Sequence, residues 1–321
     1  MSVQKEHFKN YFMVSCHIKD NNNFVFVAEE PMKEPDPFEL RKLCIIQYYG
    51  NDYSNNDFWS RPRTVNNTRM YCSSLKKQKQ WLFVSFWGDV LRTPEKIDKD
   101  SPNVLLEEEI PPLELLDHTR INRAKVIAGK MYTVSGYRDV RRRDDKDHWT
   151  ILNKGIPKNT FEEKYSEVGF IDIDGFSEND IYAAGNGPDV WNWNGKLWSQ
   201  IEIPTNAYIK GVCCADDGQV YLSTDMDSFV VGRGDRWKII KHDLDVNFRN
   251  MVWFKDRVYM AAGSTLYEIK EGKFKESKLN DMKDRPVDWS CLDANDDIML
   301  AGSKLEVATF DGEKFTTVIP F

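Results

Sequence analysis

The sequence has few of the residues and motifs that mark an enzyme or a metalloprotein. Its five histidines, at positions 7, 17, 118, 148 and 242, show neither the His-x-x-x-His nor the His-Glu-x-x-His spacing of a zinc site. A Gly-x-Ser-x-Gly nucleophile elbow and a phosphate-binding loop are both missing. We therefore expect no metal and no cofactor, and the sequence identifies no catalytic residue.

Long hydrophobic runs are also missing. Residues 1–10 contain no apolar stretch that could serve as a signal-peptide core, and no run elsewhere approaches the roughly 20 residues of a membrane-spanning helix. The six cysteines include no Cys-x-x-Cys pair, and most fall in apolar strands, so we interpret them as reduced core residues. These features favour a soluble cytoplasmic protein without a membrane partner.

Positive charge is in deficit. The chain has 44 Lys and Arg against 51 Asp and Glu, which gives a formal net charge of −7. A surface that binds nucleic acid needs a basic field, so nucleic acid is not the expected partner. A basic protein partner suits the sign. The hydrophobic content of 41%, with 13% aromatic residues, argues against a disordered chain.

Towards the C-terminus the sequence repeats with a regular period. Four short apolar strands recur every 38 to 40 residues: Asp180–Gly185, Gln219–Thr224, Arg257–Ala262 and Asp297–Gly302. Turn glycines that precede an aromatic residue keep the same period, at Gly195, Gly234, Gly272 and Gly312. Two independent markers thus indicate repeated four-stranded units.

A four-stranded unit of this length can bury both of its faces only against copies of itself, and the usual closed all-β arrangement is a propeller. We therefore predict an all-β fold, with one β-propeller domain over residues 1–321 and seven blades of four antiparallel strands. The predicted second strands begin at Phe24, Leu82, Met131, Ile181, Val220, Val258 and Ile298. The predicted blades span residues 8–65, 66–112, 120–157, 166–205, 206–245, 246–285 and 286–321.

Ring closure can also be predicted. The chain begins in a predicted inner strand and ends in a predicted outer strand, Phe315–Ile319. Each blade would then consist of contiguous sequence, so we expect closure without exchange of a strand between the two ends. Face packing alone would hold the first blade to the last, unless residues 3–10 pair with the last blade.

The connections between strands divide between the two faces of such a ring. Those from inner to second and from third to outer strands are short hairpin sequences rich in Asn, Asp and Gly. Those from second to third and from outer to inner strands vary, and variable loops usually carry specificity. We predict that this second face binds the partner through Asp189, Tyr208, Asp225, Asp227, Asp243, Asp245, Phe248, Asp281, Asp284, Asp288 and Trp289.

The run from Tyr208 to Phe315 resembles bacterial WD-repeat-like propellers. The likeness is carried by Val212-Cys-Cys-Ala-Asp-Asp-Gly-Gln-Val-Tyr221, Gly232-Arg-Gly-Asp-Arg-Trp237, Trp253-Phe-Lys-Asp-Arg-Val-Tyr259 and Leu292-Asp-Ala294. This sequence pattern is similar to that of propellers encoded beside polymorphic or type VI-delivered toxins. The resemblance implies an immunity role, in which the protein binds its cognate toxin in the cytoplasm and blocks it.

Three functional hypotheses follow. The first is a non-enzymatic immunity protein that occludes the active site of a toxin, with a basic toxin domain matching the acidic face. The second is a hydrolase or lyase with a carboxylate-lined site at the mouth of the channel, because propellers host enzymes as well as binding proteins. The third is a carbohydrate-binding lectin, for which equivalent pockets should repeat from blade to blade.

Overall fold

The computed structural model describes residues 12–29, 41–49, 59–65, 70–75, 80–93, 106–109, 120–157, 169–246, 248, 250–303 and 306–320. These residues form seven four-stranded antiparallel sheets, here numbered 1 to 7 in chain order, and one 3₁₀ helix, η1 (Lys278–Asp281). The predicted all-β fold is confirmed.

The first three sheets occupy the N-terminal part of the chain. Sheet 1 contains β1 (Phe12–Asp20), β2 (Asn23–Glu29), β3 (Arg41–Tyr49) and β4 (Trp59–Val65). Sheet 2 contains β5 (Met70–Leu75), β6 (Gln80–Ser85), β7 (Val90–Arg92) and β8 (Glu107–Glu109). Sheet 3 contains β9 (Ile121–Ile127), β10 (Lys130–Ser135), β11 (Val140–Asp145) and β12 (His148–Ile151).

The other four sheets follow at the regular period. Sheet 4 contains β13 (Phe170–Ser177), β14 (Asp180–Gly185), β15 (Val190–Trp193) and β16 (Trp198–Ile201). Sheet 5 contains β17 (Ile209–Cys214), β18 (Val220–Thr224), β19 (Ser228–Arg233) and β20 (Arg236–Lys241). Sheet 6 contains β21 (Met251–Phe254), β22 (Arg257–Ala262), β23 (Thr265–Lys270) and β24 (Lys273–Glu276). Sheet 7 contains β25 (Cys291–Ala294), β26 (Met299–Gly302), β27 (Glu306–Phe310) and β28 (Phe315–Pro320).

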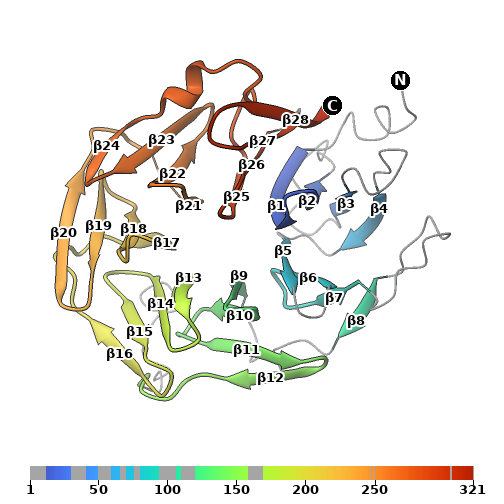
Figure 1. Ribbon diagram of the computed structural model, residues 1–321. Coiled ribbons are helices and arrows are strands. Elements are labelled where there is room, and N and C mark those ends of the chain that lie inside the picture. The colour runs from blue at the N-terminus through green and yellow to red at the C-terminus, as the bar shows by residue number, and fades with distance from the viewer. Residues whose placement is uncertain are drawn as a thin grey trace.

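The sheets are arranged radially around a central axis. In Figure 1 the first strand of each sheet lies nearest the centre and the fourth lies at the periphery. Sheet 7 packs beside sheet 1, where β1 contacts both β25 and β26. The fold is therefore a β-propeller, as the repeated period predicts.

The hydrophobic core lies between neighbouring sheets. Every residue of β6 and of β18 is buried, because a second strand is covered on both faces by adjacent sheets. One core cluster joins Phe24 and Phe26 of sheet 1 to Leu300 of sheet 7, so face packing continues across the junction of the two chain ends. Six of the seven predicted strand starts lie inside second strands, and Ile298 directly precedes β26.

Ring closure uses no exchanged strand among the described residues, since each sheet consists of four consecutive strands. The expectation that face packing alone joins the two ends is wrong. The amide N–H of Ile18 in β1 donates to Asp293 Oδ2 in β25 at 2.7 Å, and His17 Nδ1 lies 2.8 Å from the same oxygen. The proposed latch at residues 3–10 lies outside the described residues.

Four of the cysteines belong to the hydrophobic core. Cys16, Cys72, Cys213 and Cys291 are free thiols buried in the core, and burial raises the pKa of the Cys72 thiol to about 12. Such thiols are poor nucleophiles. Within the described ranges no helix has both the length and the apolar character that crossing a membrane requires.

Candidate functional site

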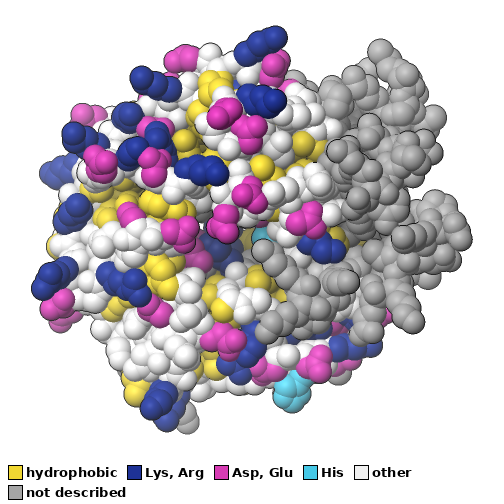
Figure 2. Space-filling view, in the orientation of Figure 1, with side chains coloured by type: hydrophobic (Ala, Val, Ile, Leu, Met, Phe, Trp, Pro, Cys, Tyr) yellow, Lys and Arg dark blue, Asp and Glu magenta, His cyan; other side chains and the backbone are white. Residues whose placement is uncertain are grey.

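The variable connections lie on one side of the ring, which we call the loop face. It consists of the connections from second to third strands and from outer to inner strands, and it includes segments 86–89, 136–139, 186–189, 202–208, 225–227, 242–246 and 277–290. Over the part of the molecule that Figure 2 colours, acidic and basic side chains are interspersed, with hydrophobic side chains exposed between them. The side of the molecule that Figure 2 shows is therefore not a uniformly acidic field.

Tyr208 is held in a fixed position on the loop face. Its amide N–H donates to Asp225 Oδ1 at 2.9 Å, and the amide N–H of Asp225 donates back to the Tyr208 carbonyl at 2.9 Å. Lys210 Nζ lies 5.3 Å from the centre of the Tyr208 ring, within range of a cation–π contact. The Tyr208 residue is nevertheless 41% exposed. This reciprocal pair ties the segment before β17 to the turn between β18 and β19.

The turn between β18 and β19 presents Met226 in a similarly fixed way. Thr224 Oγ1 accepts from the amide N–H of Met226 at 3.1 Å, and the amide N–H of Ser228 donates to the Met226 carbonyl at 2.8 Å. The Met226 residue is 55% exposed. The carbonyl of Asp227 accepts from the amide N–H of His242 at 2.8 Å, which ties the next connection to the same turn.

The structure therefore brings together five of the residues that the sequence places at the partner contact. Tyr208, Asp225 and Asp227 lie on one hydrogen-bonded unit, and Asp243 and Asp245 follow directly on the segment that His242 attaches to it. The carboxylates of Asp225, Asp227, Asp243 and Asp245 are on exposed residues. Contact of these residues with a partner remains a prediction.

Three other predicted contact residues are buried in this structure. Asp189 is tied to Arg138 Nε at 2.8 Å and to the indole N–H of Trp191 at 2.7 Å, so its carboxylate is engaged internally. Phe248 packs against Phe229, with ring centroids 5.3 Å apart, inside the core between sheets 5 and 6.

Trp289 packs against Phe315 in the core between sheets 6 and 7, with ring centroids 5.9 Å apart. As folded, Asp189, Phe248 and Trp289 have almost no surface to offer a partner. We therefore correct their assignment as surface anchors, because each side chain turns from its loop into the space between sheets.

The remaining predicted residues lie on the connection from β24 to β25. Asp281 ends helix η1, and Asp284 follows in a left-handed conformation with φ of 58°. Both residues are exposed, whereas Asp288 is half-buried and accepts a hydrogen bond from the Ser290 hydroxyl at 2.8 Å. Their role in binding also remains a prediction.

Sequence reasoning missed two aromatic residues on the same face. Trp87 lies between β6 and β7 and is 36% exposed, and Tyr137 lies between β10 and β11 and is 39% exposed. Both occur in a Ser-x-aromatic-x-Asp pattern, Ser85–Asp89 and Ser135–Asp139. The repetition of this pattern 50 residues apart is the signal in the sequence that could have identified them.

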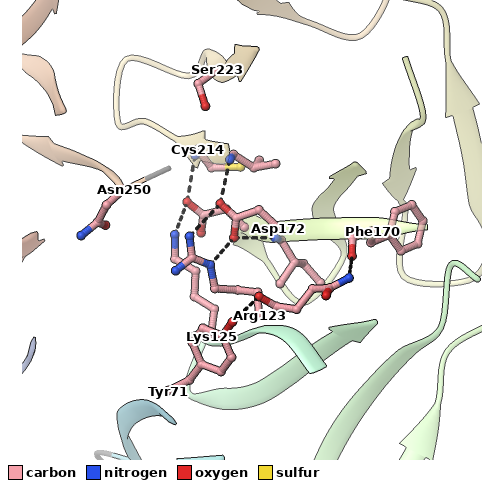
Figure 3. A network of polar contacts seen from close by, with 12 residues as sticks. Tyr71, Arg123, Lys125, Phe170, Asp172, Cys214, Ser223 and Asn250 are labelled. Atoms are coloured by element: carbon pink, nitrogen blue, oxygen red, sulfur yellow. Dashed lines mark hydrogen bonds and ion pairs between the residues drawn. The ribbon is translucent and has the colours of Figure 1, made fainter. Parts of the chain in front are cut away.

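A second polar region lies on the inner strands, where Figure 3 shows it from close by. Arg123 on β9 donates to Asp172 Oδ1 on β13 at 2.7 Å, and Asp172 Oδ2 accepts from the amide N–H of Val212 on β17 at 2.8 Å. Two residues further along each strand, Lys125 lies 2.8 Å from Asp174, which accepts from the amide N–H of Cys214 at 3.0 Å.

This network connects sheets 3, 4 and 5 through two parallel sets of contacts, each with one ion pair and one hydrogen bond to a backbone N–H. Burial acts to lower the pKa of Lys125, but the nearby Asp174 and Asp172 carboxylates outweigh it and raise that pKa above its ordinary value. Lys125 therefore stays protonated, and both carboxylates are engaged by a cation and a backbone N–H. The arrangement stabilises the packing of neighbouring sheets, and we call such a contact a tie between sheets.

The ring closure contains a third tie of the same kind. Asp293 contacts His17 Nδ1, and His17 Nε2 lies 3.1 Å from the hydroxyl of Ser73 on β5. A carboxylate, an imidazole and a hydroxyl in this order also occur in hydrolase triads. Ser73 is only 2% exposed, however, so its hydroxyl is not open to a substrate, and the contact joins sheets 7, 1 and 2. No group of three or more His, Cys, Asp or Glu side chains among the described residues could hold a metal ion.

Comparison with known proteins gives one curated relative. The chain is 31% identical over 193 residues to the protein named Immune protein Tsi7, from Pseudomonas aeruginosa. The match covers 60% of this chain and 62% of the relative, so it spans less than two thirds of that protein. No protein-family model matches the chain.

Solved structures share the fold at low sequence identity. PorZ, a bacterial surface component of the type-IX secretion system of Porphyromonas gingivalis, has a TM-score of 0.62 and 10% identity, over 97% of this chain and 38% of PorZ. YCF48 from Cyanidioschyzon merolae has a TM-score of 0.62 and 10% identity, over 95% of this chain and 96% of YCF48. YCF48 bound to D1 peptide has a TM-score of 0.59 and 13% identity, over 92% of this chain and 91% of that one.

Proposed function

We propose that this chain is a non-enzymatic immunity protein that binds a cognate bacterial toxin in the cytoplasm and occludes the toxin's active site. The observation that carries the proposal is the 31% identity to an immune protein over 193 residues. In this proposal each of the seven sheets is one blade of a WD-repeat-like ring, as the sequence period predicts.

The loop face is the proposed contact surface. Its acidic part consists of the exposed residues Asp225, Asp227, Asp243 and Asp245, which lie on one hydrogen-bonded unit. The acidic character of these residues fits a basic toxin domain, and complementary charge speeds association and excludes partners of the wrong sign. Occlusion of an active site requires a contact of ordinary protein–protein size, about 800 Å² on each partner.

The test is charge reversal of the acids that have no structural duty in the described fold. Asp227→Lys, Asp243→Lys and Asp245→Lys are combined in one variant, and Asp225 is left intact because it holds Tyr208. The purified product of the gene adjacent to this chain's own gene, with its activity inactivated, serves as the probe. We expect the Kd to rise about tenfold, mainly through slower association.

The matched control reverses three exposed acids in the short turns of the opposite face: Asp216→Lys, Asp235→Lys and Asp296→Lys. It makes the same change in net charge at a distance from the proposed contact. An equal loss of affinity in both variants would show that only net charge matters. Unchanged affinity in the loop-face variant would exclude these acids from the contact, and a wild-type protein that does not bind the probe would contradict the immunity role.

A further inference from the structure

The exposed hydrophobic residues are unevenly distributed over the described molecule. Five of the eight large ones lie on the loop face: Trp87, Tyr137, Tyr208, Met226 and Val287. The other three, Ile151, Leu197 and Ile239, lie on outer strands β12 and β20 or in the turn between β15 and β16. Single exposed hydrophobic residues are ordinary, but their accumulation on one face of a protein indicates an interaction surface.

Trp87 and Tyr137 stand in turns that are closed by the same outer hydrogen bond but differ inside it. The amide N–H of Ser85 donates to the Asp89 carbonyl at 2.8 Å, and that of Ser135 donates to the Asp139 carbonyl at 3.1 Å. In the first turn the Ser85 hydroxyl also bonds Asp89 Oδ2 at 2.8 Å. The aromatic residue stands two positions after the serine in each turn, but the inner hydrogen bonds differ: the amide N–H of Gly88 donates to the Ser85 carbonyl at 3.0 Å, whereas that of Asp139 donates to the Gly136 carbonyl at 3.3 Å. Sheets 2 and 3 thus each place an aromatic residue on the connection from the second to the third strand.

The turn at Tyr137 adopts an unfavourable backbone conformation. Tyr137 and Arg138 have φ values of 58° and 57°, in the left-handed region that residues with a side chain rarely occupy. Arg138 is drawn inward, because its guanidinium contacts Asp189 at 2.8 Å and lies 5.4 Å from the centre of the Trp191 ring. Tyr137 is consequently left on the surface. Strain of this kind persists where surrounding structure enforces it, and it is concentrated at functional sites.

Sheet 4 repeats the turn but not its aromatic residue. The amide N–H of Gly185 donates to the Asp189 carbonyl at 3.1 Å, as in the two preceding turns, and Gly187 stands at the aromatic position. The ring of Tyr208 lies directly over it, since a Cβ on Gly187 would be 3.8 Å from Tyr208 Cε1. Tyr208 therefore supplies from the next connection the aromatic side chain that this turn lacks.

We propose that Trp87, Tyr137 and Tyr208, here called the aromatic arc, anchor the partner protein across sheets 2, 3 and 4. This inference rests on the proposed function and names the part of the loop face that supplies most of the affinity. Tyr and Trp dominate the binding energy of protein interfaces because they bury large area at little cost in side-chain entropy. Trp87 and Tyr137 stand on hydrogen-bonded turns and the Tyr208 backbone is paired with Asp225, so little backbone freedom is lost on binding.

The charges around the arc define the partner's chemistry. The guanidinium of Arg120 lies 4.9 Å from the centre of the Trp87 ring, and Lys210 lies over Tyr208. Beyond Tyr208 the arc continues into the exposed acids of the segment from Asp225 to Asp227 and into Met226. The fitting surface is thus a protein patch with apolar recesses for three aromatic rings and basic residues on the side that meets Met226.

The test compares the arc with exposed hydrophobic residues elsewhere. Trp87→Ala, Tyr137→Ala and Tyr208→Ala are prepared singly, with Ile151→Ala and Ile239→Ala as controls from the outer strands. Affinity for the inactivated product of the adjacent gene is measured by calorimetry, and the thermal unfolding midpoint is measured in parallel. We expect the Kd to rise about thirtyfold for Tyr208→Ala and less for the other two arc variants, with control values within about twofold of wild type.

The outcomes separate this inference from the proposed function. If the wild-type protein binds the probe and the arc variants bind equally well, the arc is wrong and the immunity role stands. If the wild-type protein does not bind the probe, both are wrong. Self-association of the wild-type protein that the arc variants abolish would assign the arc to a second copy of this chain and overturn the inference, as would equal loss of affinity in the arc and control variants.

Discussion

The inner strands around the central axis, here called the channel wall, and the loop face use polar residues in opposite ways. On the channel wall Asp172 and Asp174 are each engaged by a cation and by a backbone N–H of the next sheet. On the loop face Asp227, Asp243 and Asp245 are exposed beside Tyr208 and Met226. Aspartate thus holds sheets together in one region and is available to a partner in the other. The difference is whether the backbone N–H of a neighbouring inner strand lies within hydrogen-bonding distance.

The comparison also explains how the ring closes without an exchanged strand. Asp172 and Asp293 each bind a backbone N–H on the inner strand of the following sheet, at Val212 and at Ile18. The closure is therefore built like an ordinary junction between sheets. It differs in its side-chain partner, which is His17 at the closure and Arg123 at the junction between sheets 3 and 4.

The largest expected effect comes from breaking a channel-wall tie. In Asp172→Ala the buried end of an ion pair is removed, so Arg123 loses its carboxylate and the amide of Val212 loses its acceptor. We expect the free energy of unfolding to fall by about 3 kcal/mol, the lower end for a broken buried pair, because Arg123 keeps some contact with water. Urea denaturation measures it.

The control for this variant is Asp216→Ala, which removes an exposed carboxylate from the turn between β17 and β18. Its unfolding free energy should stay within about 0.5 kcal/mol of wild type. Equal stability of the two variants would show that the channel network does not hold the sheets together.

A smaller effect is expected at Asp189, which belongs to the loop face by sequence and to the interior by structure. Asp189→Ala leaves Arg138 and the indole N–H of Trp191 without their acceptor, so we expect a loss of about 2 kcal/mol in unfolding free energy. Affinity for the inactivated adjacent-gene product should fall by less than in Tyr137→Ala, because Asp189 is not on the surface and affects binding only through Arg138 and the turn that carries Tyr137. A greater loss of affinity than in Tyr137→Ala, at unchanged stability, would restore Asp189 to the contact surface.

The smallest effect concerns the pH dependence of stability. Burial lowers the pKa of His242 below its ordinary value of 6.5, since its ring packs against both Phe229 and Phe274. The unfolded chain therefore takes up the proton at a higher pH than the folded protein. The contribution of the neutral ring is present above pH 6.5 and is lost as the pH falls from there towards the lower pKa of the folded state.

His242→Phe should remove this part of the pH dependence, which we expect to amount to about 1 kcal/mol or less. The measurement is the unfolding free energy between pH 7.5 and 5, roughly the range in which histidine titrates. His148→Gln, which replaces an exposed histidine on β12, is the control. A wild-type slope in His242→Phe would contradict the assignment.

The second strands and turn glycines could be predicted because each is encoded locally. Val220 and Val258 belong to continuous apolar strands, and Gly195 and Gly234 have φ values of 88° and 61°, which glycine adopts without strain. Since these signals recur at a fixed period, they also predict stacking of the units into a ring. The sequence placed Asp225 and Asp227 on an exposed turn for the same local reason.

The aromatic arc and the buried position of Asp189 could not be read from the same signals. The early sheets carry longer connections, so the positions of Trp87 and Tyr137 do not follow the later period. Asp189 resembles its exposed neighbours in sequence, but its orientation depends on Arg138, which reaches it from sheet 3. A contact between residues of different sheets cannot be predicted from the local sequence pattern around either residue.

By itself, the sequence determined the repeated four-stranded unit, because hydrophobic strands and turn residues act over a few neighbouring positions. Only the tertiary structure decided which carboxylates tie sheets together, which remain exposed, and which aromatic residues line one side of the ring. Those outcomes depend on the distance between side chains that are 40 or more residues apart in the chain, and that distance exists only after the sheets have packed against each other.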